Sequence, residues 1–241
     1  MSAKESFDFK SGEVLLVNKP LHWTSFDVVN KLRYSIKRKL EVKKIKVGHA
    51  GTLDPLADGL LILCTGKKTK TIESLMGLEK VYSGEITLGS TTPSYDLETE
   101  IDQTYPTDHF TSELIKGEVE KMIGDYDQYP PIFSAKKVNG KKAYDLARKG
   151  IDVELKPKRI NISRFEITRF EDNKLSFVIA CSKGTYIRSI AHDLGKNLNS
   201  GGHLSVLRRE EIGEYSIKDS YTVEEWIEKI ENSDVPIIES N

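Results

Sequence analysis

Residues 48–59 read GHAGTLDPLADG and lead directly into the apolar run at residues 59–64, GLLILC. The apolar run predicts a buried strand, and the glycines before it permit a tight loop in which backbone can approach a ligand closely. Asp54 stands immediately before Pro55, which restricts Asp54 to extended geometry and offers no N–H for its carboxylate to bind. The segment therefore predicts a strand preceded by a loop that presents one carboxylate.

Two interpretations of this loop stay open. An isolated Asp-Pro pair is usually a surface turn in which the aspartate bonds nearby backbone amides. However, His49, Thr52 and Asp54 crowd one loop that follows the densest basic cluster of the chain, residues 31–46 with eight bases and one acid. Such a loop is typical of a place where a protein contacts a ligand. Asp54 is therefore a candidate functional residue.

A second candidate segment is GTYIRSI at residues 184–190, where a predicted strand turns into a predicted helix. It sets Tyr186 and Arg188 at the mouth of that turn. Taken alone, Arg188 would be interpreted as a solvated helix residue, because most charged side chains face water. If Arg188 lies beside Asp54, its guanidinium would orient that carboxylate and keep it ionised.

The remaining periodicity favours an α+β fold. Apolar runs and alternation predict strands at residues 12–17, 59–64, 80–89, 159–170 and 175–181, whereas helical spacing predicts helices at 24–39, 111–123, 186–198 and 222–230. Within 159–170 the apolar positions change parity from Ile160 and Ile162 to Phe165 and Ile167, which predicts a β-bulge. Residues 203–212 fit neither pattern. Strands come mostly in adjacent pairs with helices interspersed irregularly, unlike a repeated βαβ array.

Charge and composition restrict the class of protein. Overall, 36 Lys+Arg against 37 Asp+Glu exclude a uniformly basic chain, but residues 210–241 hold ten acids and two bases, which leaves 34 bases and 27 acids in residues 1–209. A polyanionic partner therefore stays possible. No apolar run reaches the roughly 18 residues that span a membrane, and residues 1–10 lack the apolar segment of a secretory signal. We expect a cytoplasmic protein.

Metal and disulfide chemistry find no support in the sequence. Two cysteines, Cys64 and Cys181, cannot form a disulfide framework, and the five histidines are scattered without the spacing of a zinc site. We therefore expect no metal.

Taken together, these segments resemble the ordered signature motifs of the TruB-type tRNA pseudouridine synthases. The resemblance extends from about residue 12 to residue 213, nearly the whole chain, and the motif at residues 48–59 is its most specific part. Six segments carry it, in the order of the family: 18–20 (NKP), 48–59, 80–82 (KVY), 129–136 (YPPIFSAK), 184–188 (GTYIR) and 207–209 (LRR).

The resemblance implies the pseudouridine-synthase fold, a long, mixed and mainly antiparallel sheet flanked by helices with a central RNA-binding cleft. It implies one catalytic domain over residues 10–235, with a basic RNA-binding insertion at about 124–150 and no complete C-terminal RNA-binding (PUA-like) domain. The implied activity is isomerisation of uridine to pseudouridine at position 55 in the TΨC arm of tRNA. The resemblance implies no cofactor, no metal and no obligatory protein partner.

The family motifs also imply roles for individual residues. Asp54 attacks the ribose, either as a nucleophile at C1′ or by removing the C2′ proton, and Arg188 keeps it ionised. Tyr82 stacks on the displaced base and assists in removing the C5 proton. A flipped base must recover a few kcal/mol of lost stacking, to which aromatic planes contribute roughly 1–3 kcal/mol per base. The residues that line the nucleotide pocket are His49, Tyr82, Tyr186 and Leu207.

Three basic segments, at residues 31–46, 67–70 and 124–150, are expected to follow the phosphates of the TΨC arm. Such contacts give affinity that weakens with salt but little sequence specificity. The acidic residues 210–241 are expected to face away from RNA.

The chain departs from the family pattern at two positions near the predicted site. His22 stands where the family usually has glycine, so it costs energy if this position requires a positive φ. Ala50 replaces a common threonine and removes one hydroxyl hydrogen bond. Three other functions stay open: a tRNA-binding or tRNA-folding protein without chemistry, a synthase that modifies another RNA, and a nucleosidase that releases uracil.

Overall fold

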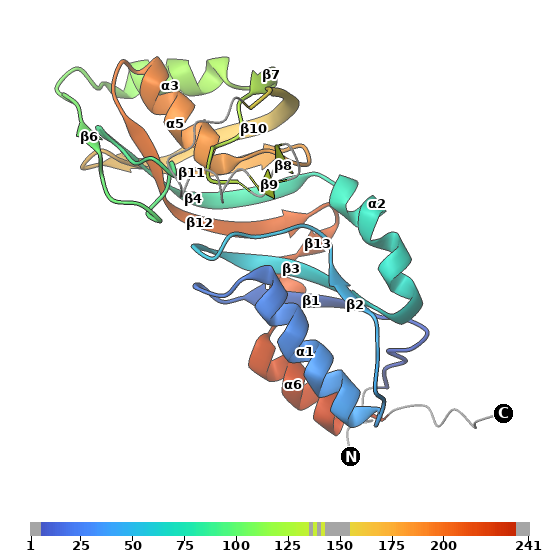
Figure 1. Ribbon diagram of the computed structural model, residues 1–241. Coiled ribbons are helices and arrows are strands. Elements are labelled where there is room, and N and C mark those ends of the chain that lie inside the picture. Colours follow the sequence, from blue (N-terminus) through green and yellow to red (C-terminus); the bar gives the residue numbers. More distant parts are fainter. Residues whose placement is uncertain (1–5, 135–136, 139–140, 143–154, 235–241) are drawn as a thin grey trace. The chain divides into compact units, whose positions relative to one another are not determined.

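The computed structural model describes residues 6–134, 137–138, 141–142 and 155–234, and its ribbon is drawn in Figure 1. The chain forms two compact units. The terminal unit comprises residues 1–80 and 208–241, and the middle unit comprises residues 81–207. Strand β12 (Gly202–Ile212) runs through both, because the boundary between units lies at residues 207–208. Helices and strands occur in each unit, which confirms the predicted α+β class.

The sheet of the terminal unit is built around β3 (Ala57–Thr65). This strand pairs antiparallel with β1 (Val14–Lys19) and β2 (Val47–His49), while β1 also pairs parallel with the short β14 (Tyr221–Thr222). The end of β12 pairs with β13 (Tyr215–Ser216). Nearly every residue of β3 is buried, as expected for an apolar run covered on both faces.

Helices cover the two faces of β3. On one face α1 (Ser25–Lys39) and α6 (Val223–Asn232) lie side by side (Figure 1) and pack against Leu61 and Leu63. On the other face η1 (Gly66–Thr71) leads into α2 (Ile72–Gly77), whose Leu75 packs with Leu60 and Ile62. Alternation along the strand separates the two clusters. The first cluster also includes Phe9, Leu15, Val17, Val28, Val29, Leu32, Ile36, Val223, Trp226 and Ile230.

Capping residues determine where the two packed helices begin. Thr24 accepts a hydrogen bond from the Asp27 N–H at 3.1 Å while the Asp27 carboxylate accepts one from the Thr24 N–H at 2.8 Å. Thr222 and Glu225 form the same reciprocal pair at the start of α6. Each pair satisfies N–H groups that lack a partner within the helix. The prediction of a helix at residues 222–230 is confirmed, and Thr222 is its N-cap.

The middle unit has strands in the order β12-β4-β11-β10-β7. The hairpin of β10 (Lys158–Glu171) and β11 (Lys174–Cys181) is antiparallel, and β7 (Gly124–Gln128) pairs antiparallel with the start of β10. β4 spans Lys80–Leu88. Helices α3 (Ser112–Lys121) and α5 (Ile187–Asn197) contact each other beside β10 (Figure 1). Two further two-stranded antiparallel sheets pair β5 (Ser90–Thr91) with β6 (Gln103–Thr104), and β8 (Lys137–Val138) with β9 (Lys141–Lys142).

Two features of these strands bear on the sequence predictions. The register of β10 against β11 shifts between Ile162 and Arg164, where the apolar parity changes, so the predicted bulge is confirmed. The ambiguous residues 203–212 are strand β12. Its buried positions include His203 and Arg209, and these polar side chains interrupt the apolar alternation.

Parts of the domain prediction are not tested by these observations. Of the predicted RNA-binding insertion, residues 135–136, 139–140 and 143–150 lie outside the described residues. A single catalytic domain over residues 10–235 stays a prediction. Within the described part of the chain, no helix combines the length and the apolar character that crossing a membrane requires.

Candidate active site

The loop that carries Asp54, residues 50–56, joins β2 to β3 in the terminal unit and is called the aspartate loop below. Gly51 has φ +111° and Gly59 has φ +106°, and a side chain at Gly59 would collide with the backbone of Arg209. Glycine is therefore required where the loop enters β3. The backbone oxygen of Asp54 accepts a hydrogen bond from the Ala57 N–H at 3.1 Å, and the Asp54 side chain is only partly buried. The loop thus has a defined shape, and Asp54 is partly exposed.

The first residue of α1 holds this loop from one side. Ser25 is buried, and its Oγ donates to the Leu53 carbonyl at 3.1 Å and accepts from the Leu53 N–H at 2.8 Å. Both bonds go to the residue immediately before Asp54. The start of a well-capped helix therefore fixes the backbone from which the carboxylate projects.

Arg209 holds the loop and β3 at three further backbone positions. Its side chain is only 1% exposed, and its Nε donates to the Leu60 carbonyl at 2.7 Å. Nη1 lies 3.3 Å from the Thr52 carbonyl and Nη2 lies 3.2 Å from the Gly51 carbonyl. A buried guanidinium is tolerated where such acceptors satisfy its donors. No role was predicted for Arg209, because arginine is mostly exposed and Arg209 stands out in the sequence only as part of the LRR motif.

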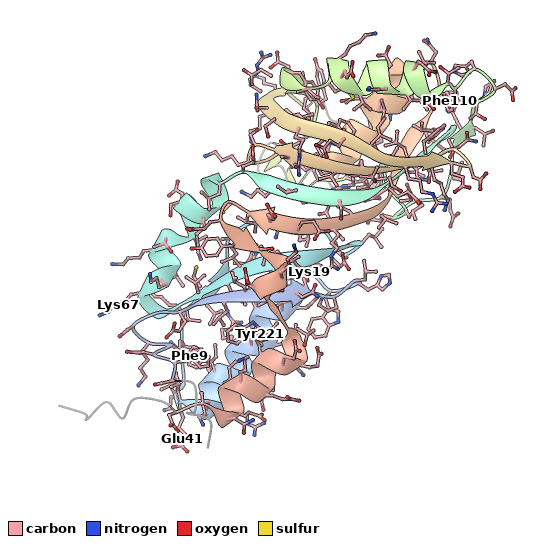
Figure 2. The ribbon with its side chains drawn as sticks, turned by 180° about the vertical axis from the view of Figure 1, so that it is seen from behind. Phe9, Lys19, Glu41, Lys67, Phe110 and Tyr221 are labelled. Carbon is pink, nitrogen blue, oxygen red and sulfur yellow. The ribbon has the colours of Figure 1, made fainter. Side chains whose placement is uncertain are left out.

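Lys19, at the end of β1 (Figure 2), is a second buried cation in the terminal unit. Its Nζ donates to the carbonyls of Pro20 at 2.9 Å and Trp23 at 2.7 Å. Burial lowers its pKa to about 8, and the carboxylates of Asp58 and Asp54 oppose that shift. Lys19 therefore places an ammonium group in the electrostatic environment of the aspartate loop. In the sequence it is marked only by its place in the NKP motif.

His49 ends β2, a few residues before Asp54. Its side chain is partly buried, and burial lowers the pKa of the imidazole below its usual value because it disfavours the charged form. His49 is therefore a neutral group at pH 7.

The departure at His22 has a measurable structural consequence. His22 adopts φ +66°, and its N–H donates to the carbonyl of Pro55 at 2.7 Å. The position thus requires the left-handed backbone that glycine adopts most easily, and it contacts the aspartate loop directly. Ala50, the other departure, is fully buried.

The other predicted site residues belong to the middle unit. Tyr82 lies on β4 and Leu207 on β12, and each is nearly buried. Tyr186 is the residue before α5 and stays partly exposed. Thus His49 and Asp54 belong to one unit, whereas Tyr82, Tyr186, Arg188 and Leu207 belong to the other. The pairing of Asp54 with Arg188 stays a prediction.

Arg188 lies in the first turn of α5 and is only 6% exposed, so its interpretation as a solvated helix residue is wrong. Its Nε lies 3.5 Å from Oδ2 of Asp96, which is itself buried. Nη1 donates to the carbonyl of Phe133 at 3.0 Å. These contacts hold the guanidinium in a fixed orientation. Asp96 was not predicted, because nothing in its local sequence indicates a partner about ninety residues away.

Metal binding finds no candidate here. In the part of the chain that the structure describes, no group of three or more His, Cys, Asp or Glu side chains is arranged to hold a metal ion.

Comparison with known proteins identifies the family of this chain. The model of the TruB family pseudouridylate synthase (N terminal domain) matches residues 37–187. The chain is 54% identical over 231 residues to the tRNA pseudouridine synthase B of Phocaeicola vulgatus, which covers 95% of this chain and 98% of that protein. The protein of the same name from Flavobacterium johnsoniae is 52% identical over 217 residues, with 90% and 95% covered.

Solved structures agree on the fold. A structure of an H/ACA RNP bound to a substrate RNA containing 2′-deoxyuridine matches 91% of this chain with a TM-score of 0.64 and 23% identity. A Cbf5-Nop10-Gar1 complex matches 92% with a TM-score of 0.65 and 24% identity. This chain spans 53% and 60% of the length of those two chains. From the family model and the near full-length relatives together, the chain belongs to the TruB family of pseudouridylate synthases.

Proposed function

We propose that this protein converts uridine to pseudouridine at position 55 in the TΨC arm of tRNA. The observation that carries the proposal is the 54% identity, over nearly the whole length of both chains, to a tRNA pseudouridine synthase B. The enzyme acts in the cytoplasm, without cofactor, metal or obligatory protein partner. It flips the target nucleotide out of the loop, because a glycosidic carbon within a base stack cannot be reached by a side chain.

Asp54 is the proposed catalytic residue. Its carboxylate attacks the ribose of the flipped uridine, the C1′–N1 bond breaks, and the freed uracil rotates and rejoins through C5. This role is supported by the geometry of the loop, whose backbone is held before Asp54 by Ser25 and Arg209 and after it by Arg209 at Leu60, while Asp54 stays partly exposed. A reactive group that is held in place before substrate binds loses less entropy in the transition state.

The proposed partners of Asp54 act on the same nucleotide from the middle unit. Arg188 keeps the carboxylate ionised, and its contacts to Asp96 and to the carbonyls of Phe133 and Ser94 support a role that needs one orientation. Tyr82 stacks on the uracil and assists in removing the C5 proton. The pocket is completed by His49, Tyr186 and Leu207.

The basic segments are proposed to bind phosphates. Residues Lys31, Arg38, Lys43, Lys44 and Lys46 of the first segment are exposed, as are Lys67, Lys68 and Lys70 of the second. The last turn of α1 carries three bases and lies about 20 Å along the helix from the Ser25 end that holds the aspartate loop. Bases at that distance would contact the stem of the TΨC arm rather than the flipped nucleotide.

The test is the substitution Asp54→Asn, which removes the charge and keeps the shape. We expect pseudouridine formation in an unmodified tRNA transcript to fall by at least about 10³-fold, while tRNA affinity changes by less than about threefold because phosphate contacts dominate it. The matched control is Asp172→Asn, the same change in an exposed turn where φ is +50° and asparagine is well tolerated. Normal turnover by Asp54→Asn would refute the role of Asp54.

The same reactions separate the other functions. Release of free uracil indicates a nucleosidase, and tRNA binding without any turnover by the wild-type protein indicates a binding or folding protein. A transcript with cytidine in place of the uridine at position 55 should yield no pseudouridine. Mapping pseudouridine in total RNA from cells with and without the gene identifies the target: loss at another RNA, with position 55 unchanged, overturns the proposed substrate.

A further inference from the structure

Gln128 is a buried polar residue that neither the motifs nor the proposed chemistry uses. It is the last residue of β7 and is only 1% exposed. Its carboxamide bonds both main-chain groups of one residue: Oε1 accepts from the Tyr186 N–H at 2.8 Å, and Nε2 donates to the Tyr186 carbonyl at 3.0 Å. The side chain thus pairs with Tyr186 as a neighbouring strand would.

The position of Tyr186 makes this pairing consequential. Tyr186 is the residue at which the chain enters α5, and no side-chain hydrogen bond caps this helix. The first turn of a helix without a cap has N–H groups that need partners. Gln128 supplies a partner for the N–H of Tyr186, and its second bond fixes the carbonyl that also accepts from the Ile190 N–H at 3.2 Å.

A second pair of groups determines the orientation of the Gln128 amide. Nε2 also donates to the Tyr126 hydroxyl at 3.1 Å, and that hydroxyl donates to Oδ2 of Asp193 at 3.4 Å. The two amide hydrogens are therefore used by Tyr186 and Tyr126, and Oε1 is left to accept from the Tyr186 N–H. Rotating the amide by 180° would place donor against donor. A buried network that is satisfied in only one arrangement is specific as well as stabilising.

The neighbouring contacts connect the same two segments. Ser189 Oγ donates to the Tyr129 carbonyl at 2.8 Å, and Arg188 Nη1 donates to the Phe133 carbonyl at 3.0 Å. Residues 128–133 and the first turn of α5 are therefore joined at three successive points. Gln128 is the one of these that bonds the backbone of Tyr186 directly.

We propose that Gln128 is a positioning residue for pseudouridine formation, which sets the backbone at Tyr186 and so directs Tyr186 and Arg188 toward the flipped nucleotide. This inference rests on the proposed function. Gln128 touches no reacting atom, and its effect passes through Tyr186, which lines the proposed pocket, and Arg188, which is proposed to keep Asp54 ionised. Displacing catalytic groups by about 1 Å can reduce a rate by about 100-fold. Loss of Gln128 is therefore expected to lower kcat far more than it changes KM.

The first experiment measures kcat and KM of Gln128→Ala with an unmodified tRNA transcript. We expect kcat to fall about 10- to 100-fold while KM changes by less than about threefold. The matched control is Gln103, an exposed glutamine on β6, replaced by alanine, which should behave as wild type. A folded Gln128→Ala variant with unchanged kcat, or one in which only KM rises, overturns the inference.

The variant Gln128→Glu tests the inference through the pH dependence of kcat, which a purely structural role of Gln128 would not change. The ionised side chain can accept from the Tyr186 N–H but cannot donate to its carbonyl, whereas the protonated side chain does both, as glutamine does. Its kcat relative to wild type should therefore rise as pH falls from 8 to 5.5, at temperatures where circular dichroism shows all proteins folded. Gln103→Glu should show no such trend, and absence of the trend in Gln128→Glu refutes the inference even if Gln128→Ala does not fold.

The two proposals can fail separately. Wild-type protein that forms no pseudouridine in tRNA overturns the proposed function and this inference with it. An active wild-type enzyme whose kcat survives both Gln128 substitutions overturns the inference alone.

Discussion

Asp193 on α5 should make the middle unit less stable as pH rises, and Asp193→Asn should remove that effect. Burial raises the pKa of this carboxyl to about 6, while the Tyr126 hydroxyl and Lys196 oppose the shift. The usual value for aspartate is close to 3.9. At neutral pH the folded chain therefore holds a carboxylate in surroundings that favour the neutral acid.

The sign and size of the effect follow from proton binding. Between about pH 4 and pH 6 the folded state binds one proton more than the unfolded state at Asp193, so the free energy of unfolding falls by about 1.4 kcal/mol per pH unit. Over two units this gives about 3 kcal/mol, which we reduce to about 1–2 kcal/mol because the side chain is partly exposed and water screens its charge. Asparagine carries no charge and keeps an oxygen for the Tyr126 hydroxyl.

The assay is urea unfolding from pH 4 to pH 7.5, followed by far-ultraviolet circular dichroism. Fluorescence alone would not report on the middle unit, because both tryptophans, Trp23 and Trp226, belong to the terminal unit. We expect Asp193→Asn to match wild type near pH 4 and to be about 1–2 kcal/mol more stable at pH 7. The control Asp108→Asn, at an exposed residue, should follow wild type throughout. A difference between Asp193→Asn and wild type that does not change with pH would refute the reasoning.

Two further substitutions test the support of the aspartate loop. His22→Gly should stabilise the terminal unit by up to about 1 kcal/mol in urea unfolding followed by tryptophan fluorescence, because it relieves the strain of φ +66° and keeps the N–H bond to Pro55. The control His22→Ala keeps the strain and should give no gain in stability. Equal gains for both variants would contradict the explanation. Arg209→Lys should destabilise the same unit by about 2–4 kcal/mol, since a single ammonium cannot replace three separated donors. A loss of stability below about 0.5 kcal/mol would show that the guanidinium contacts contribute little.

Local patterns predicted the elements well where one physical effect dominates. The buried strand β3, the capped helix α6 and the bulge in β10 each follow from apolar spacing or capping chemistry within a few residues. In β12 the pattern fails, because His203 and Arg209 occupy buried positions that alternation assigns to apolar residues. Burial of these side chains depends on partners elsewhere in the chain, which periodicity does not report.

In the candidate site, too, residues marked by their local sequence could be predicted, whereas residues that act through distant partners could not. The motifs single out Asp54 and Arg188 as candidates, because their neighbours in sequence carry the signal. The residues that hold them in place were missed, since their contacts join distant positions: Arg209 with Leu60 and Gln128 with Tyr186. No single sequence indicates that a particular glutamine faces a particular main-chain group 58 residues away.

The terminal unit is built from the two ends of the chain, residues 1–80 and 208–241, and this has a consequence for synthesis on the ribosome. The middle unit is made from one continuous segment, and such a segment can fold as it emerges. The aspartate loop cannot settle at the same time, because Arg209 is translated 149 residues after Leu60, and α6 follows later still. A nascent chain paused before residue 208 should therefore contain no competent aspartate loop, which delays tRNA modification until translation has passed that point.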